Sequence, residues 1–151
     1  MTEITIDLRD PASFFWWTDV TIRFSDQDPN AHVNNTAFPV YCEAGRVDYL
    51  KAVRTHLDIK ARSVLASVTV DYVNQLYYPG VVCVGTRLTR VGGKSFTLSQ
   101  GLFAQGTKKD GLVATSTAVL VGFNYQEDRT LPLPDIMRDA LADGRPLTSK
   151  G

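Results

Sequence analysis

The sequence lacks both an imbalance of charge and a long apolar run. Its 151 residues include 16 basic and 16 acidic side chains, with no block of one sign, so no electrostatic footprint for a nucleic acid is present. No apolar run approaches membrane-spanning length. The acidic start, MTEITIDLRD, lacks the basic and apolar regions of a signal peptide. We therefore expect a cytoplasmic protein with neither nucleic acid nor membrane as a partner.

Cysteine and histidine are scarce, with two of each. Cys42 and Cys83 lack the spacing of a metal site or a redox motif, and we expect both to be small buried side chains. The segment GGKS at 92–95 suggests a phosphate-binding loop, but Leu88 stands where that motif needs a glycine. The sequence thus predicts no metal site and no cofactor.

The length and a hydrophobic content of 44% predict one globular domain over residues 1–151. Residues 17–28 alternate between apolar and polar side chains, as in a strand. Continuing that alternation points Asp26 and Asp28 inward until Pro29 ends the run.

Residues 35–55 are expected to form a helix, with Asn34 or Asn35 as its N-cap. Apolar residues occur on more than one side of it, which predicts an enclosed helix. Gly45 inside the helix predicts close packing against a sheet.

Four longer runs rich in β-branched and aromatic residues follow, at 62–75, 81–91, 94–105 and 112–124. Short breaks with turn residues predict that neighbours in sequence pair as antiparallel hairpins. The tail from Tyr125 is expected to form an extended exit and a short helix in 135–144. These elements predict an α+β hotdog fold, in which a five-stranded antiparallel sheet wraps around a long central helix.

The segment FSDQDPNAHVNNTAFPVYCEAGRVDYL resembles the opening of the 4-hydroxybenzoyl-CoA thioesterase-like family of hotdog proteins. In that family F-x-D-x-D precedes a Gly-His-Val-Asn-Asn-like turn and a helix with E-x-x-R. The resemblance covers about residues 18–134. Ala31 replaces the family's usual glycine, and Phe38 replaces a common tyrosine.

The resemblance implies an acyl-CoA thioesterase whose acid is Asp28 and whose polarising amide is the backbone N–H of Asn35. Elementary chemistry agrees, because a carboxylate can act as base or nucleophile. The unpaired N–H groups of a helix start carry partial positive charge for a carbonyl oxygen. Asp26 is expected to brace the turn.

The octet DPNAHVNN also resembles the D-x-N-x-H-V-N-N motif of plant acyl carrier protein thioesterases, in which Asp28, Asn30 and His32 would share the catalysis. Whether His32 reacts or braces the turn stays open. Glu43 could reach the site or pair with Arg46 three residues later.

Arg90, Lys94 and Ser95 lie around the turn VGGKSF, from which relatives bind coenzyme A phosphates. A solvated hairpin is the plainer interpretation of the same residues. We expect these three residues to bind substrate.

Two other functions compete with hydrolysis. The hydratase motif D-x-N-P-x-H has a different spacing, and a non-catalytic acyl-CoA-binding module would have no use for an inward acid. Long strands rich in valine and threonine, with the aromatic run at 14–17, predict a homodimer or homotetramer. The family resemblance implies the same, with active sites shared between subunits. The aromatic run could instead fold back over the sheet.

Overall fold

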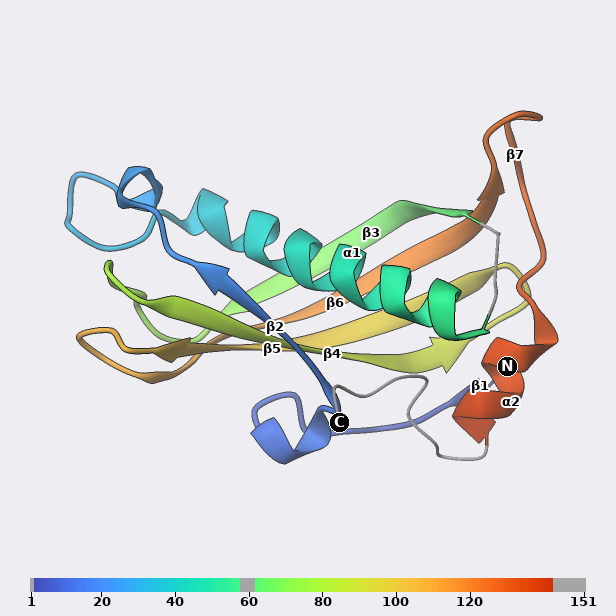
Figure 1. Ribbon diagram of the computed structural model, residues 1–151, viewed down its shortest axis with the longest axis horizontal. Coiled ribbons are helices and arrows are strands. Elements are labelled where there is room, and N and C mark those ends of the chain that lie inside the picture. The colour runs from blue at the N-terminus through green and yellow to red at the C-terminus, as the bar shows by residue number, and fades with distance from the viewer. Residues whose placement is uncertain (1, 58–61, 143–151) are drawn as a thin grey trace.

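The computed structural model describes residues 2–57 and 62–142. One antiparallel sheet curves around the helix α1 (Phe38–Leu57), which crosses its concave face (Figure 1). The strands are β1 (Thr2–Glu3), β2 (Trp16–Thr21), β3 (Arg62–Tyr72), β4 (Val81–Val91), β5 (Ser95–Gln105), β6 (Gly111–Asn124) and β7 (Arg129–Thr130). The α+β hotdog prediction is confirmed, with two short strands added to the five expected ones.

The order of the strands corrects one expectation. β4, β5 and β6 pair as successive hairpins, but β3 pairs with β6 at the far edge of the sheet and does not pair with β4. The connection 73–80 is long enough to cross the end of the sheet. Its turn residues therefore did not indicate whether β3 and β4 pair with each other. Within the described residues, β3 therefore has one strand neighbour and one open edge.

The first expected strand, 17–28, is shorter in the structure and ends at Thr21. A 3-10 turn follows at Phe24–Asp26, because the Asp26 carboxylate accepts the Arg23 N–H and curls the chain. The inward direction of Asp26 is nevertheless confirmed, since this residue is only 5% exposed.

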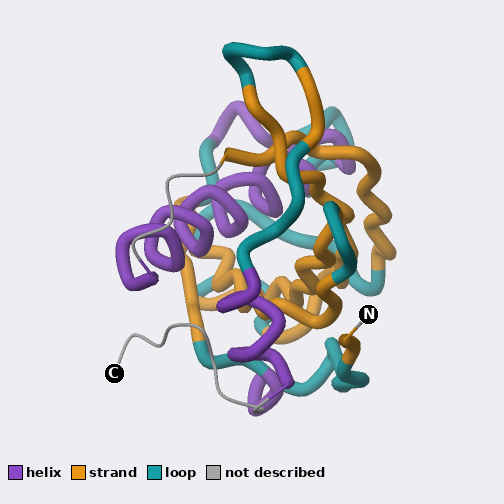
Figure 2. Tube along the Cα trace, turned by 90° about the vertical axis from the view of Figure 1, so that its right-hand side faces the viewer, coloured by secondary structure: helices purple, strands orange, loops and turns teal. Residues whose placement is uncertain are grey.

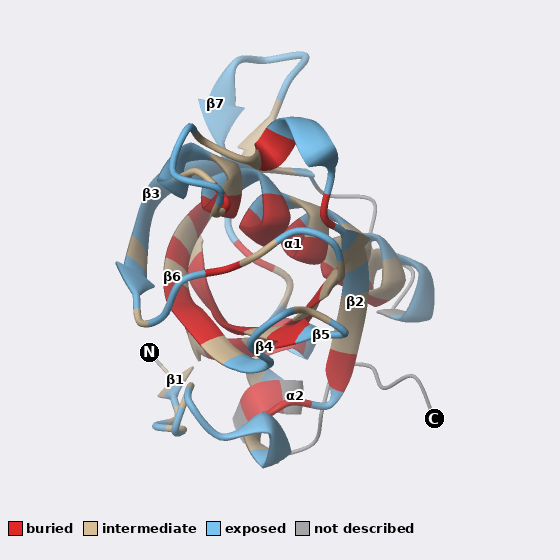
Figure 3. Cartoon of the chain, turned by 90° about the vertical axis from the view of Figure 1, so that its left-hand side faces the viewer, coloured by how far each residue is buried: buried red, intermediate tan, exposed pale blue. Residues whose placement is uncertain are grey.

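The helix begins later than expected, after a 3-10 turn at Asn35–Ala37, and Asn34 is its cap. Gly45 packs closely, as predicted: a Cβ there would lie 2.6 Å from Cγ1 of Val84. The expectation of an enclosed helix is wrong for a single chain. Figure 3 shows buried stretches of α1 within the curve of the sheet. Val40 and Val47 on the same helix are nevertheless more than half exposed.

The N-terminal aromatic run leads into the sheet, with Trp16 and Trp17 as the first residues of β2 and Phe15 40% exposed. Phe14 and Trp16 are buried, and the ring of Trp17 packs edge-on against Phe103. The helix α2 (Asp135–Ala142) packs at the opposite end of the molecule from the start of α1 (Figures 1 and 2). The expected last residues of that helix, 143–144, lie outside the described residues. Among the described helices, none is long and apolar enough to cross a membrane.

Candidate active site

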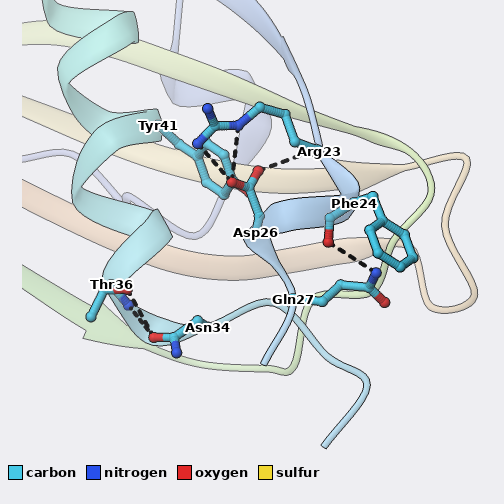
Figure 4. A network of polar contacts seen from close by, with 7 residues as sticks. All are labelled: Arg23, Phe24, Asp26, Gln27, Asn34, Thr36 and Tyr41. Atoms are coloured by element: carbon cyan, nitrogen blue, oxygen red, sulfur yellow. Dashed lines mark hydrogen bonds and ion pairs between the residues drawn. The ribbon is translucent and has the colours of Figure 1, made fainter. Parts of the chain in front are cut away.

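A carboxylate network anchors the loop that leads from β2 into α1. Asp26 accepts hydrogen bonds from the Arg23 backbone N–H at 2.9 Å, from the Arg23 guanidinium at 2.8 and 3.0 Å, and from the Tyr41 hydroxyl at 2.7 Å (Figure 4). Burial alone would raise the pKa of Asp26, but these bonds hold it below the usual value. Asp26 also accepts the Asn34 N–H through its backbone carbonyl. Its role is to brace the loop, as predicted.

The tight turn from Asp28 to His32 projects from this anchored base. The Asp28 N–H donates to the His32 carbonyl at 2.9 Å, and the Ala31 N–H donates to the Asp28 carbonyl at 3.1 Å. Ala31 has φ 64°, a left-handed conformation that favours glycine. The residue that replaces the family's usual glycine therefore has a conformation that favours glycine.

A cavity of about 520 Å³ opens beside this turn. Asp28 faces it with a side chain that is 16% exposed. One carboxylate oxygen of Asp28 accepts the Asn30 N–H at 2.8 Å, and the other lies 3.4 Å from Nδ1 of His32. The lining residues are Asp28, His32, Val33, Asn35, Phe38, Tyr72, Val73, Asn74, Gln75, Tyr77 and Lys109.

The start of the helix faces the same cavity. The Asn34 side chain accepts the Thr36 N–H at 2.9 Å, and the next residue, Asn35, is among the lining residues. No bond from the Asn35 N–H to another described residue is present. The Asn35 carbonyl accepts the Tyr72 hydroxyl at 2.9 Å, and the Tyr72 ring packs on Phe38. β3 thus fixes the first turn of α1.

Several lining residues escaped the sequence analysis because they come from other parts of the chain. Tyr72 and Asn74 lie at the end of β3, and Lys109 lies in the β5–β6 hairpin. Lys109 is the one lysine or arginine among the described lining residues, and its Nζ donates to Asn74 at 3.4 Å. The pairing of β3 with β6 brings these three residues together, and no local sequence motif predicts that pairing.

Not all of the predicted site residues meet at this cavity. Asp28, His32 and Asn35 line it, whereas Asn30 is exposed and contributes its backbone N–H to Asp28. The three residues predicted to bind phosphate, Arg90, Lys94 and Ser95, lie at the other end of the sheet.

The position of those three residues follows from the strand register. The Gly122 N–H donates to the Lys94 carbonyl, and Ser95 pairs with Val121, near the C-terminal end of α1. Lys94 is exposed and donates to Thr130, while Arg90 donates to the Ser95 hydroxyl at 3.4 Å. Within one chain they cannot share a site with Asp28.

Glu43 and Arg46 form no ion pair in the described structure. Glu43 is exposed, whereas Arg46 is only 6% exposed. Burial lowers the pKa of Arg46. Cys42 is buried as expected, while Cys83 is only partly buried.

The cavity is lined by an acidic residue, Asp28, by His32 and by Asn35, which precedes α1. A carboxylate can take a proton or attack a carbonyl, and the N–H can polarise the carbonyl oxygen. Among the described residues, no group of three or more histidine, cysteine, aspartate or glutamate side chains could hold a metal ion.

Comparisons with known proteins agree with this fold. A structure of a predicted thioesterase from Bacillus stearothermophilus is 35% identical, with a TM-score of 0.71 over 90% of this chain and 98% of that one. A thioesterase from Thermus thermophilus, complexed with coenzyme A and Zn, is 30% identical, with a TM-score of 0.71 over 88% of this chain and 98% of that one.

The uncharacterized protein YsmA of Bacillus subtilis is 31% identical over 87 residues, which span 57% of this chain and 59% of YsmA. The family model described as the thioesterase-like superfamily matches residues 22–141. That segment holds the anchored loop, the cavity and the whole sheet from β3 to β7, and the chain belongs to the thioesterase-like superfamily.

Proposed function

We propose that this chain hydrolyses an acyl-CoA thioester to a free acid and coenzyme A. The observation that supports the proposal is that Asp28 and Asn35, which lies in the 3-10 turn before α1, line one cavity. Membership in the thioesterase-like superfamily supports the reaction type. The coenzyme A bound to the Thermus thermophilus relative supports the carrier.

In the reaction, the Asn35 N–H binds the thioester carbonyl oxygen as negative charge develops on it. With Asp28 as base, the carboxylate takes a proton from water while the water oxygen attacks the carbonyl carbon. The C–S bond then breaks, and the proton passes to the departing thiolate. With Asp28 as nucleophile, its oxygen displaces the thiolate, and water hydrolyses the resulting anhydride.

A second possible mechanism for the same reaction divides the catalysis among Asp28, Asn30 and His32. His32 lies beside Asp28 at 3.4 Å, which fits a role in orienting water or the carboxylate. The exposed Asn30 side chain favours Asp28 with the helix amide over the shared mechanism. The variant His32→Ala separates them: we expect a smaller loss than for Asp28→Asn, and an equal loss would favour the shared mechanism.

We further propose that the protein is at least a homodimer through the open edge of β3. Val64, Leu65 and Val68 on this strand are each about two-fifths exposed, and Tyr72 at its end is half exposed. A two-fold axis across β3 would pair each strand with its copy in an antiparallel ladder. Light scattering should give at least twice the 16.7 kDa chain mass, and a monomer at micromolar concentration would contradict this.

Such a dimer would bring the predicted substrate-binding residues of one chain closer to Asp28 of the other. Antiparallel pairing of β3 brings the end of one chain that holds Lys94 and Ser95 toward the end of the partner that holds Asp28. We therefore keep Arg90, Lys94 and Ser95 as proposed phosphate ligands, contributed across the dimer.

The experiment is thiol release from a panel of acyl-CoA and acyl carrier protein thioesters. The wild type should turn over its best acyl-CoA, and Asp28→Asn should lose most of that activity with its fold intact. Asp139→Asn changes an exposed aspartate in α2 and serves as the control. Turnover of carrier-protein thioesters alone would favour that substrate, while binding without turnover would favour a non-catalytic acyl-CoA-binding module.

A further inference from the structure

A buried cation in the middle of α1 has no counter-ion among the described residues. Arg46 is 6% exposed and forms no ion pair, and its Nη1 has no hydrogen-bond partner in the described chain. Glu43 acts on its charge, but it is exposed and does not pair with it. A charge removed from water without a partner is costly, so an anion that reached Arg46 would gain a strong partner.

Two uncharged polar groups lie close to this cation. Gln100 and Ser116 are neighbours across β5 and β6, and each is at most 2% exposed. Gln100 Nε2 donates to the carbonyl of Cys42, one turn before Arg46 on α1. The Ser116 hydroxyl and the Arg46 charge both act on the pKa of the Cys42 thiol. Gln100 Oε1 and Ser116 Oγ have no hydrogen bond of normal geometry with the described residues. We call Arg46, Gln100 and Ser116 the Arg46 cluster.

The Arg46 cluster lies a short distance from the candidate catalytic cavity, which Phe38 and Tyr72 line. Ser116 pairs with Val70, two residues before Tyr72 on β3, a displacement of about 7 Å. Arg46 follows Phe38 by eight positions, or about 12 Å along a helix. Because side chains on a helix lean back over the preceding turn, its guanidinium lies about 7 Å beyond Phe38. The two estimates agree.

An exposed strip of the sheet connects the cavity with the Arg46 cluster. Val68 lies on the same face of β3 as Tyr72, because side chains alternate along a strand. They pair with Ala118 and Ala114 of β6, which belong to the core, so this is the concave face that α1 crosses. Yet Val68 is 40% exposed and Tyr72 is 51% exposed. An acyl group that leaves the cavity along this strip would reach the Arg46 cluster.

We propose that Arg46 binds a carboxylate at the far end of the acyl group, so that the protein prefers ω-carboxyacyl thioesters, the half-thioesters of dicarboxylic acids. This inference rests on the proposed thioesterase function. The Arg46 guanidinium and the Ser116 hydroxyl donate to the carboxylate oxygens. Gln100 Oε1 can only accept, and a water molecule beside the carboxylate supplies its donor. These residues determine specificity and take no part in breaking the thioester bond.

The first test compares adipoyl-CoA with hexanoyl-CoA, which have the same number of acyl carbons and differ at the far end. The wild type should have a kcat/KM for adipoyl-CoA at least about tenfold above that for hexanoyl-CoA. The methyl ester of adipoyl-CoA keeps the chain without the charge and should behave like hexanoyl-CoA. A wild type without a preference for adipoyl-CoA would overturn the proposal.

Variants assign that preference to particular side chains. Arg46→Met should remove it and leave kcat/KM for hexanoyl-CoA unchanged, while Ser116→Ala should reduce it about fivefold. Lys51→Met removes an exposed charge from the same helix and should keep the full preference. If Arg46→Met kept the preference, the proposal would be overturned. A change in the mass that light scattering gives for Arg46→Met would also overturn it, because Arg46 would then contact another subunit.

Ligand binding without turnover separates this proposal from the catalytic one. Adipamate and hexanamide carry an amide in place of the thioester and differ in the terminal carboxylate. Adipamate should raise the Tm of the wild type more than hexanamide does, and Arg46→Met should lose that difference. Hydrolysis of hexanoyl-CoA without an effect of adipamate would overturn the carboxylate assignment and leave hydrolysis standing. The adipamate effect without hydrolysis of any thioester would support the carboxylate site and overturn the thioesterase function.

Discussion

Replacing Gly45 with alanine tests how tightly α1 is packed on the sheet. The new Cβ would lie 2.6 Å from Cγ1 of Val84 and 2.8 Å from Nε2 of Gln100, and contacts below 3.0 Å require something to move. The Gln100 amide cannot move freely, because it donates to the Cys42 carbonyl and to the Thr86 hydroxyl, both at 3.0 Å.

The expected change in the free energy of unfolding for Gly45→Ala is the sum of opposing contributions. Alanine should stabilise the helix by about 1 kcal/mol relative to glycine. Overpacking should cost about 1–3 kcal/mol, and each Gln100 bond that breaks should cost about 1 kcal/mol more. We expect a net loss of about 2 kcal/mol in the free energy of unfolding, which corresponds to a Tm lower by about 4–8 °C for a chain of this size.

Urea unfolding followed by circular dichroism measures this difference. Ala44→Gly, at the preceding helix position, is the matched control and should lose about 1 kcal/mol through helix propensity alone. If Gly45→Ala raised the free energy of unfolding by about the same amount, the packing argument would be refuted.

Three further changes test the loop and the start of the helix. Ala31→Gly should raise the free energy of unfolding by about 0.5–1 kcal/mol, because glycine adopts φ 64° without strain; an unchanged or lower stability would count against that conformation. Asp26→Asn should lower it by about 2–3 kcal/mol at pH 7. The folded-state pKa of Asp26 is lowered, so the extra stability of the wild type is present above about pH 4 and should shrink as the pH falls through the folded pKa. A stability difference that does not depend on pH would contradict the network. Tyr72→Phe should lower kcat about fivefold with little change in KM, since the bond to the Asn35 carbonyl is lost; an unchanged kcat would remove Tyr72 from the positioning of α1.

The fold could be predicted from the sequence where the signal was local. Alternation and β-branched runs gave the long strands, and the Asn34 cap and Gly45 placed the helix against the sheet. The pairing of β3 with β6 could not be predicted, because antiparallel partners far apart in sequence carry no local mark. The exposure of one side of α1 could not be predicted either. An apolar residue such as Val47 does not indicate whether other residues of its own chain bury it.

The candidate site could be predicted in part, through the segment that precedes α1. Asp28, His32 and Asn35 lie within eight positions of sequence, and all three line the cavity. Tyr72 at the end of β3 and Lys109 in the β5–β6 hairpin are distant from that segment in sequence, so only the tertiary structure reveals them.

The central claim is that Asp28 performs thioester hydrolysis in the cavity beside the start of α1. The most direct measurement is the rate of thiol release from the best acyl-CoA substrate, for the wild type and for Asp28→Asn at matched concentration, with unfolding curves recorded for both. The account predicts that the variant folds with a similar Tm and loses at least about 100-fold in kcat. A folded Asp28→Asn protein with near wild-type turnover would contradict it.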